Sequence, residues 1–233
     1  PTIEELTSDK FITWGWTNGL PQHTPGFIFK TANKKIKSNN EGGLLLIEKN
    51  INYRITIWDN FSEFNSYFSE QEYFINALAS SVKKEITIRL HPVYKNLKWD
   101  EEARWNDFDR SLKIDTGSSS IANLIKKSRL VVHSYDSTGM LETLSNNIPT
   151  LAFWQNGFDN LSDEAKPYYK VLLDAGIIHL TPESAAFKVN NVWADVNAWW
   201  GQNEIQKARK EFCDHYARFS DNPIYDLKKI LLK

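Results

Sequence analysis

Short apolar segments alternate with segments of helical periodicity between residues 44 and 180 of this 233-residue chain. The connections between the apolar segments are too long for hairpins, and such connections join parallel strands through right-handed crossovers. Strands that alternate with helices in this way lie in one layer, with the helices on both of its faces. The pattern therefore predicts an α/β fold with an open, doubly wound, mostly parallel Rossmann-like sheet.

Local patterns give the ranges of these elements. Residues 44–47 form a continuous apolar run after two glycines, which is typical of a strand covered on both faces. Serines 118–120 provide a helix N-cap, and Gly176 ends a helix. The predicted strands are 44–47, 85–92, 112–115, 129–134, 149–154 and 176–180, with 53–59 as either a strand or a loop; the predicted helices are 63–78, 118–128, 137–147 and 164–176.

The chain divides into three parts by composition. Residues 1–43 form an N-terminal arm and linker that we expect to pack on the domain, residues 44–180 form the Rossmann-like core, and residues 181–233 show only helical patterns. In the arm, Trp14 and Trp16 flank a glycine; they either pack on the domain or a missing neighbour, or line a ligand cleft. In the tail, three tryptophans have spacings that favour packing on one buried face: Trp193, Trp199 and Trp200.

Overall composition excludes several classes of protein. The formal net charge of -1 gives no general attraction to nucleic acid. The single cysteine, Cys213, excludes an intramolecular disulfide framework, and no apolar run approaches the roughly 18 residues of a membrane-spanning helix. We therefore predict a cytoplasmic protein. Because the chain begins at Pro1 rather than Met, we expect it to be a fragment of a longer one.

A polar turn follows the predicted strand 129–134, and it holds Asp136, Ser137, Thr138 and Gly139 in a row. Ligands of open parallel sheets bind beyond the carboxyl ends of the strands, and the N-terminus of a helix there stabilises an anion such as phosphate. Gly139 would allow close approach, and Glu142 could accept hydrogen bonds from a ribose. The alternative is that Ser137 or Thr138 only caps the helix.

A second polar cluster, Arg89, His91 and Pro92, ends another predicted strand and should lie at the same edge of the sheet. Arg89 or His91 could neutralise a leaving phosphate; the alternative is an ordinary strand exit with a solvated arginine. His133 also ends a strand and joins the binding candidates, whereas His179 is expected to pack. No histidine pair has metal-ligand spacing, so we predict no metal site.

Common nucleotide and hydrolase motifs are missing from the sequence. Neither the G-x-G-x-x-G fingerprint, nor the P-loop, nor the G-x-S-x-G nucleophile elbow occurs. A phosphate site in this chain would therefore depend on the turn at 136–139 rather than on a glycine-rich loop.

The order of strand, Ser-Thr-Gly turn, helix with glutamate, Asn-x-Pro and strand resembles the donor-binding C-terminal half of GT-B glycosyltransferases. More closely, "KSRLVVHSYDSTGMLETLSNNIPTLAFW", "LLDAGIIHLTPESAA" and "VWADVNAWW" are similar to a family of transferases found with surface O-antigen genes. This similarity runs from Phe11 to the end of the chain. It implies a nucleotide-sugar donor, a glycan acceptor and a missing N-terminal GT-B-like half.

The pair "RLHP" and "DST" also resembles the His-Pro and serine motifs of bacterial sialyltransferases and Kdo transferases, which hold the cytidine monophosphate of their donors. This resemblance implies that His91 contacts donor phosphate or cytidine, and that Ser137 and Thr138 bind phosphate. Donors based on uridine diphosphate remain an alternative.

Together these observations predict the donor-binding domain of a glycosyltransferase that uses a CMP-linked sugar for surface polysaccharide, such as the O-antigen of lipopolysaccharide. Asp136 and His91 are the predicted catalytic residues. No metal or other cofactor and no nucleic acid is expected, and the acceptor would bring the protein to a membrane surface. Two alternatives are a sugar-nucleotide epimerase of GT-B-like fold and a noncatalytic module that binds nucleotide or protein, the latter through Trp14 and Trp16. The predicted substrate-binding residues are Arg89, His91, His133, Ser137, Thr138, Gly139 and Glu142.

Overall fold

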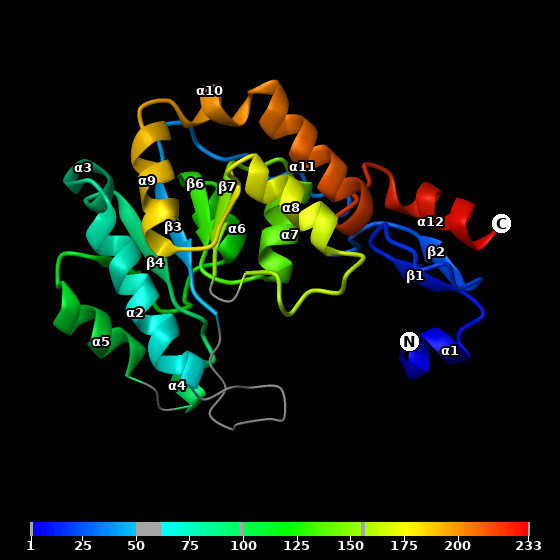
Figure 1. The fold of residues 1–233 in the computed structure, drawn as a ribbon, viewed down its shortest axis with the longest axis horizontal. Helices are drawn as coiled ribbons and strands as arrows, with labels where there is room; N and C mark the ends of the chain where they lie inside the picture. The colour runs from blue at the N-terminus through cyan, green and yellow to red at the C-terminus, as the bar shows by residue number, and fades with distance from the viewer. Residues whose placement is uncertain (1, 50–61, 98–99, 155–156, 233) are drawn as a thin grey trace.

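A six-stranded sheet forms the centre of the protein, seen here in a computed structural model that describes residues 2–49, 62–97, 100–154 and 157–232 (Figure 1). All of its strand pairs are parallel, and the strand order is β5-β4-β3-β6-β7-β8. This is the doubly wound Rossmann-like order, which reverses between β3 and β6. The strands are β3 (Gly43–Ile47), β4 (Ile86–Arg89), β5 (Lys113–Asp115), β6 (Ser128–His133), β7 (Thr150–Phe153) and β8 (Ile178–His179).

Helices cover both faces of this sheet, as the apolar run in β3 predicts. Leu44 packs with Phe74 of α2, whereas the next residue, Leu45, packs with Ile125 of α6. Because successive side chains of a strand point to opposite faces, α2 and α6 lie on opposite sides. Figure 1 shows α9 beside α2, and α11 beside both α7 and α8. The helices are α2 (Ser62–Ala77), α3 (Ser80–Lys83), α4 (Tyr94–Leu97), α5 (Glu101–Phe108), α6 (Ile121–Ile125), α7 (Thr138–Ser145), α8 (Lys166–Asp174), α9 (Pro182–Val192), α10 (Val196–Trp200), α11 (Asn203–Tyr216) and α12 (Pro223–Leu231).

The predicted fold class is confirmed, including the helical C-terminal tail of α9 to α12. The proposed strand or loop at 53–59 lies outside the described residues. Helix α5 was not predicted, because half of its residues are charged and Trp105 is its only fully buried apolar side chain. A single aromatic residue gives no helical periodicity, so only its contacts in the folded protein identify this helix.

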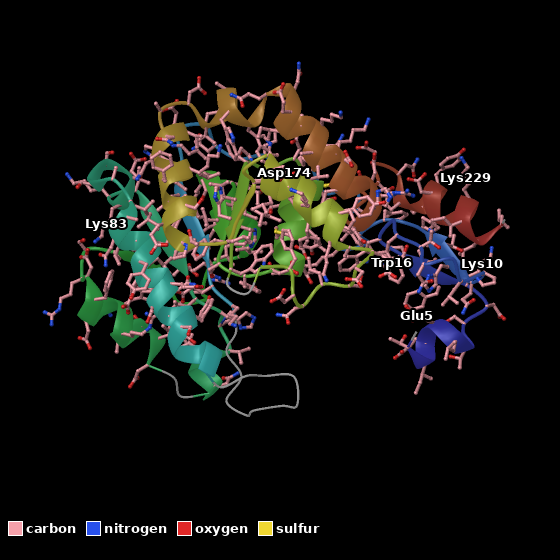
Figure 2. All side chains as sticks on the ribbon, in the orientation of Figure 1. Glu5, Lys10, Trp16, Lys83, Asp174 and Lys229 are labelled. Atoms are coloured by element: carbon pink, nitrogen blue, oxygen red, sulfur yellow. The ribbon has the colours of Figure 1, made fainter. Side chains whose placement is uncertain are left out.

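The N-terminal residues form a small unit at one end of the molecule, where Figure 1 shows β1 and β2 beside α12. It contains α1 (Ile3–Thr7) and two parallel strands, β1 (Phe11–Thr13) and β2 (His23–Pro25). Figure 2 shows Trp16 in this unit. The centroids of the Trp16 and His23 rings lie 4.9 Å apart, and the two rings are perpendicular. The Arg218 amide donates to the Trp14 carbonyl at 3.0 Å, and the Trp14 side chain packs against the main core.

The tail tryptophans are buried, as their spacing predicts. Trp193, Trp199 and Trp200 belong to the main hydrophobic cluster, and the Trp200 indole N–H donates to Asn147 Oδ1 at 2.9 Å. His179 is also a packing residue, since its ring is buried and contacts Ser184 Oγ at 2.8 Å. These residues therefore stabilise the fold rather than form a ligand site.

The backbone of Gly43 passes close to the start of β4. A Cβ atom at Gly43 would lie 2.2 Å from the Glu85 carbonyl oxygen. We expect Gly43→Ala to lower the free energy of unfolding by about 2 kcal/mol, because added atoms in a filled space force the backbone to shift. Urea denaturation measures this change. Gly201→Ala is the milder control, since its Cβ would lie 3.1 Å from the nearest atom, and equal losses would contradict the expectation.

Candidate functional site

A cleft of about 350 Å³ opens at the carboxyl ends of β3, β4 and β6, where the strand order reverses. Ligands of doubly wound sheets bind at this position. The cleft brings together the two polar clusters that the sequence separates by about forty residues. Predicted site residues in its wall are Arg89, His91, His133, Thr138, Gly139 and Glu142; Asp136 and Ser137 lie beside it rather than in its lining.

Arg89 is held at the cleft by an ion pair across the sheet. It is the last residue of β4, and its register partner Asp115, the last residue of β5, receives a hydrogen bond from its Nη1. Burial would raise the pKa of Asp115, but hydrogen bonds from Ser119, Arg89 and the Gly117 amide lower it. The pair is therefore ionised, and a guanidinium with five N–H donors is fixed beside the cleft.

His91 contributes a neutral imidazole. Its Nδ1 accepts a hydrogen bond from the Val93 amide at 3.4 Å, which leaves the ring proton on Nε2. Partial burial, and then the charge of Arg89, lower the His91 pKa below its usual value. His91 can thus donate a hydrogen bond to a ligand oxygen near pH 7, while Arg89 supplies the positive charge. Gly117 allows the loop after β5 to pack closely against Pro92, the residue after His91. Its φ is +90°, and a Cβ atom at this position would lie 2.5 Å from Pro92 Cβ.

The N-terminus of α7 faces the cleft through Thr138 and Gly139. Ser137 is the N-cap, and its hydroxyl accepts the Met140 amide at 3.1 Å, so the capping alternative holds for this serine. Thr138 is exposed and lines the cleft. The first amides of a helix have no partner within the helix and carry the positive end of its dipole. The turn is therefore suited to an anion, with Thr138 rather than Ser137 offering the hydroxyl.

His133 supports this turn from below. The residue is fully buried, its Nε2 lies 3.2 Å from Thr143 Oγ1, and its Nδ1 lies 3.5 Å from Ser137 Oγ. Burial lowers the His133 pKa to about 3, so the ring stays neutral. Its Cε1 would lie 3.2 Å from a Cβ at Gly139, which explains a small residue at that position. His133 positions the start of α7 and brings no charge to a ligand.

The N-terminal arm completes the cleft wall, and no motif in the sequence predicts this. Lys30 forms an ion pair with Glu142 at 2.7 Å, and the Ile36 amide donates to Asn146 Oδ1 at 3.1 Å. These two contacts hold residues 30–36 across α7, so that Lys30, Thr31 and Ile36 line the cleft. Glu142 is thus paired with an exposed lysine cation, and a ligand hydroxyl at this place would lie near both charges.

A second pocket, of about 240 Å³, lies beside the cleft and contains Asp136. Tyr135 lines both spaces. The Asp136 carboxylate accepts a hydrogen bond from the Tyr169 hydroxyl at 3.1 Å. Loss of water around this carboxyl group raises the Asp136 pKa, although the hydrogen bond opposes the change. Across the same pocket, the Tyr67 hydroxyl donates to or accepts from Ser134 Oγ at 2.8 Å.

Directly after β3, Glu48 is buried in a cluster of polar groups that the sequence does not reveal. The Trp105 indole donates to its Oε1 at 2.9 Å, and Arg104 Nη2 lies 3.8 Å from the same atom. Burial raises the pKa of Glu48 to about 8 and that of Glu101 to about 7. Helix α5 is therefore attached to the sheet by groups that the fold prefers in their protonated form.

The fold is that of a doubly wound α/β domain, and the cleft lies where its strand order reverses. The chain belongs to the LIC12162 family of transferases, whose sequence profile matches residues 1–231. The structure of the wall teichoic acid polymerase TagF matches it with a TM-score of 0.43 and 13% identity, over 84% of this chain and 45% of the polymerase chain. The chain thus spans less than half of that polymerase.

No curated protein matches the chain. Among the helices of the described residues, none combines the length and the apolar character that crossing a membrane requires.

The raised pKa of Glu48 gives stability a pH dependence. The folded state holds a proton on Glu48 up to about pH 8, whereas the unfolded chain releases it near 4.5. Stability therefore falls as pH rises between these values, because the folded state binds more protons. We expect stability to fall less steeply with pH in Glu48→Gln. Some pH dependence should remain in this variant, because the pKa of Glu101 is also raised. Melting temperatures at pH 5, 6.5 and 8 measure it; parallel curves for the two proteins would contradict the assignment.

Proposed function

We propose that this domain binds the nucleotide-activated sugar of a glycosyltransferase. The observation that carries the proposal is the meeting of Arg89, His91 and the N-terminus of α7 in one cleft at the carboxyl edge of the sheet. A guanidinium, a neutral N–H donor and free helix amides together suit a phosphate group. Membership of a transferase family supports the reaction class. The resemblance of the turn and helix to GT-B donor sites supports a sugar as the transferred group.

In this proposal the donor phosphate lies against Thr138 and Gly139. When an acceptor hydroxyl oxygen bonds to the sugar carbon and the bond between sugar and phosphate breaks, negative charge grows on the departing phosphate oxygen. Arg89 balances that charge, and His91 donates a hydrogen bond from Nε2. Because these donors are already fixed by Asp115 and by the Val93 amide, they need little rearrangement as the charge develops. No metal is part of the proposal, since the arginine and the helix N-terminus supply positive charge.

The remaining parts of the donor and the acceptor are assigned from their surroundings. The paired charges of Glu142 and Lys30 would bind ribose hydroxyls. The neighbouring pocket, reached past Tyr135, would hold the sugar, with Asp136 as the carboxylate beside the reacting carbon. A CMP-linked donor, a surface glycan such as O-antigen as acceptor, and a second domain that supplies the rest of the active site follow from the sequence resemblance alone.

Variants of two neighbouring residues, Ser137 and Thr138, distinguish a loss of nucleotide binding from a loss of stability. We expect Thr138→Val to weaken nucleotide binding by roughly 5- to 10-fold with an unchanged melting temperature, because its hydroxyl lines the cleft. Ser137→Ala should instead destabilise the protein by about 1 kcal/mol, as loss of an N-cap does. Calorimetric titration with CMP, UDP, GDP and their sugar conjugates measures the first effect and identifies the base. Full-strength binding by Thr138→Val would place the phosphate elsewhere.

Asp136 allows a test of the chemical step. We expect Asp136→Asn to keep donor affinity within about twofold, because the carboxylate lies outside the phosphate cleft, and to lower the slow hydrolysis of the bound donor at least about tenfold. Tyr169→Phe, which removes the hydroxyl that contacts Asp136, is the milder comparison. Products are resolved by chromatography. A change of sugar configuration without release of nucleotide would indicate an epimerase, and an absence of turnover in every variant and the parent would indicate a binding module.

A further inference from the structure

A second candidate binding site lies at the C-terminal end of α7, whose N-terminal end faces the cleft proposed above to bind the donor, called the donor cleft below. This pocket, of about 540 Å³, is enclosed by residues 35–37 of the arm, by the C-terminal end of α7 and by α11. Ile36 and Asn146 line both this pocket and the donor cleft. We call it the basic pocket, because its lining contains five cationic side chains: Lys35, Lys37, Arg209, Lys210 and Arg218.

The charge of the basic pocket is poorly balanced by the protein. Asp214 is the one carboxylate in its lining, and Lys35 pairs outside the lining with Asp221 at 2.5 Å. Within the described part of the chain, Lys37 and Lys210 form no ion pair. Since the whole chain has a net charge of -1, this is a local concentration of positive charge rather than a general property.

The two arginines are held in fixed orientations. Arg209 donates from Nη1 to the Leu144 carbonyl at 3.0 Å and from Nε to Gln206 at 3.2 Å. Arg218 donates from Nε to the Asp214 carbonyl at 2.6 Å. A guanidinium that is oriented in advance loses less side-chain entropy when it binds an anion. These bonds use only part of each donor set, so donors remain for a ligand.

Ser145 provides an independent sign of a ligand. This serine is 7% exposed and lines the basic pocket, yet its hydroxyl has no hydrogen-bond partner within the described residues. A buried hydroxyl without a partner is costly, on the order of 1–3 kcal/mol. A ligand oxygen in the pocket would satisfy it. The floor beside it is apolar, with Ile36, Cys213 and Phe219.

We propose that the basic pocket binds a phosphate group carried on a partly apolar molecule. The cations and the Ser145 hydroxyl would hold the phosphate, and the floor would hold the apolar part. The phosphate could belong to a soluble compound or to a lipid headgroup, and both present the same chemistry to these residues. This proposal does not depend on the function of the donor cleft.

Inorganic pyrophosphate and lipid vesicles are the probes for this site. We expect the full chain to bind pyrophosphate in calorimetric titration, and the double variant Lys37→Ala, Lys210→Ala to bind at least tenfold more weakly. Lys34→Ala, Lys207→Ala is the matched control, since these lysines lie on the same two segments but outside the lining. Asp214→Asn should strengthen binding by removing a like charge. Ser145→Ala should weaken it without lowering the melting temperature.

The outcomes separate the two sources and the two sites. Thr138→Val, which alters the donor cleft, should leave this binding component unchanged. Sedimentation with phosphatidylglycerol and phosphatidylcholine vesicles tests whether the phosphate belongs to a lipid headgroup. Binding to the anionic vesicles alone that is lost in the Lys37→Ala, Lys210→Ala variant would identify a lipid phosphate. Binding of pyrophosphate without binding to vesicles would identify a soluble compound. Equal losses in the pocket and control variants, or binding of neither probe, would overturn the proposal.

Discussion

The burial of β3 and β6 at the centre of the sheet is the constraint on which the remaining structure depends. Leu44 to Leu46 are at most 1% exposed, so helices must cover them on both sides, and the chain has to reverse its winding direction beside this strand. At that reversal the connections on the two sides of the sheet lead away from each other, which leaves an opening at the carboxyl ends of the central strands. The polar residues at the ends of β4 and β6 therefore lie around an opening, the cleft lined by Arg89 and Thr138, and the pocket of Asp136 lies beside it.

Several polar side chains that line the cleft are each held in place by a neighbouring group. Asp115 fixes Arg89, the Val93 amide fixes the tautomer of His91, and the hydroxyl of Ser137 leaves that of Thr138 available. His133, buried and neutral, determines how closely α7 approaches β6. Such support explains how a cleft without a glycine-rich loop can present a defined set of hydrogen-bond donors.

Much of the fold could be predicted from the sequence, because apolar runs and caps are local signals. Apolar runs in the local sequence predict the strands around 44–47 and 129–134. The N-cap residue Ser137 predicts the helix that follows it. The meeting of Arg89 and His91 with Thr138 could be inferred from parallel topology. By contrast, Glu48 with Trp105, and Lys30 with Glu142, are contacts between segments far apart in the chain. No local pattern encodes them, and charged helices such as α5 lack the apolar stripe that periodicity detects.

The position of residues 30–36 across α7 has a consequence for how the domain responds to its ligand. One wall of the cleft comes from a segment that precedes the core in the sequence. Lys30 and Ile36 join this segment to α7 and the residue after it, and the Asn33 amide joins it to the Ser220 carbonyl of the C-terminal tail. A ligand that contacts this wall would link occupancy of the cleft to docking of the segment, and each would favour the other by the same free energy. Slower hydrogen exchange in the N-terminal amides would accompany ligand saturation, although those amides lie outside the Rossmann-like core.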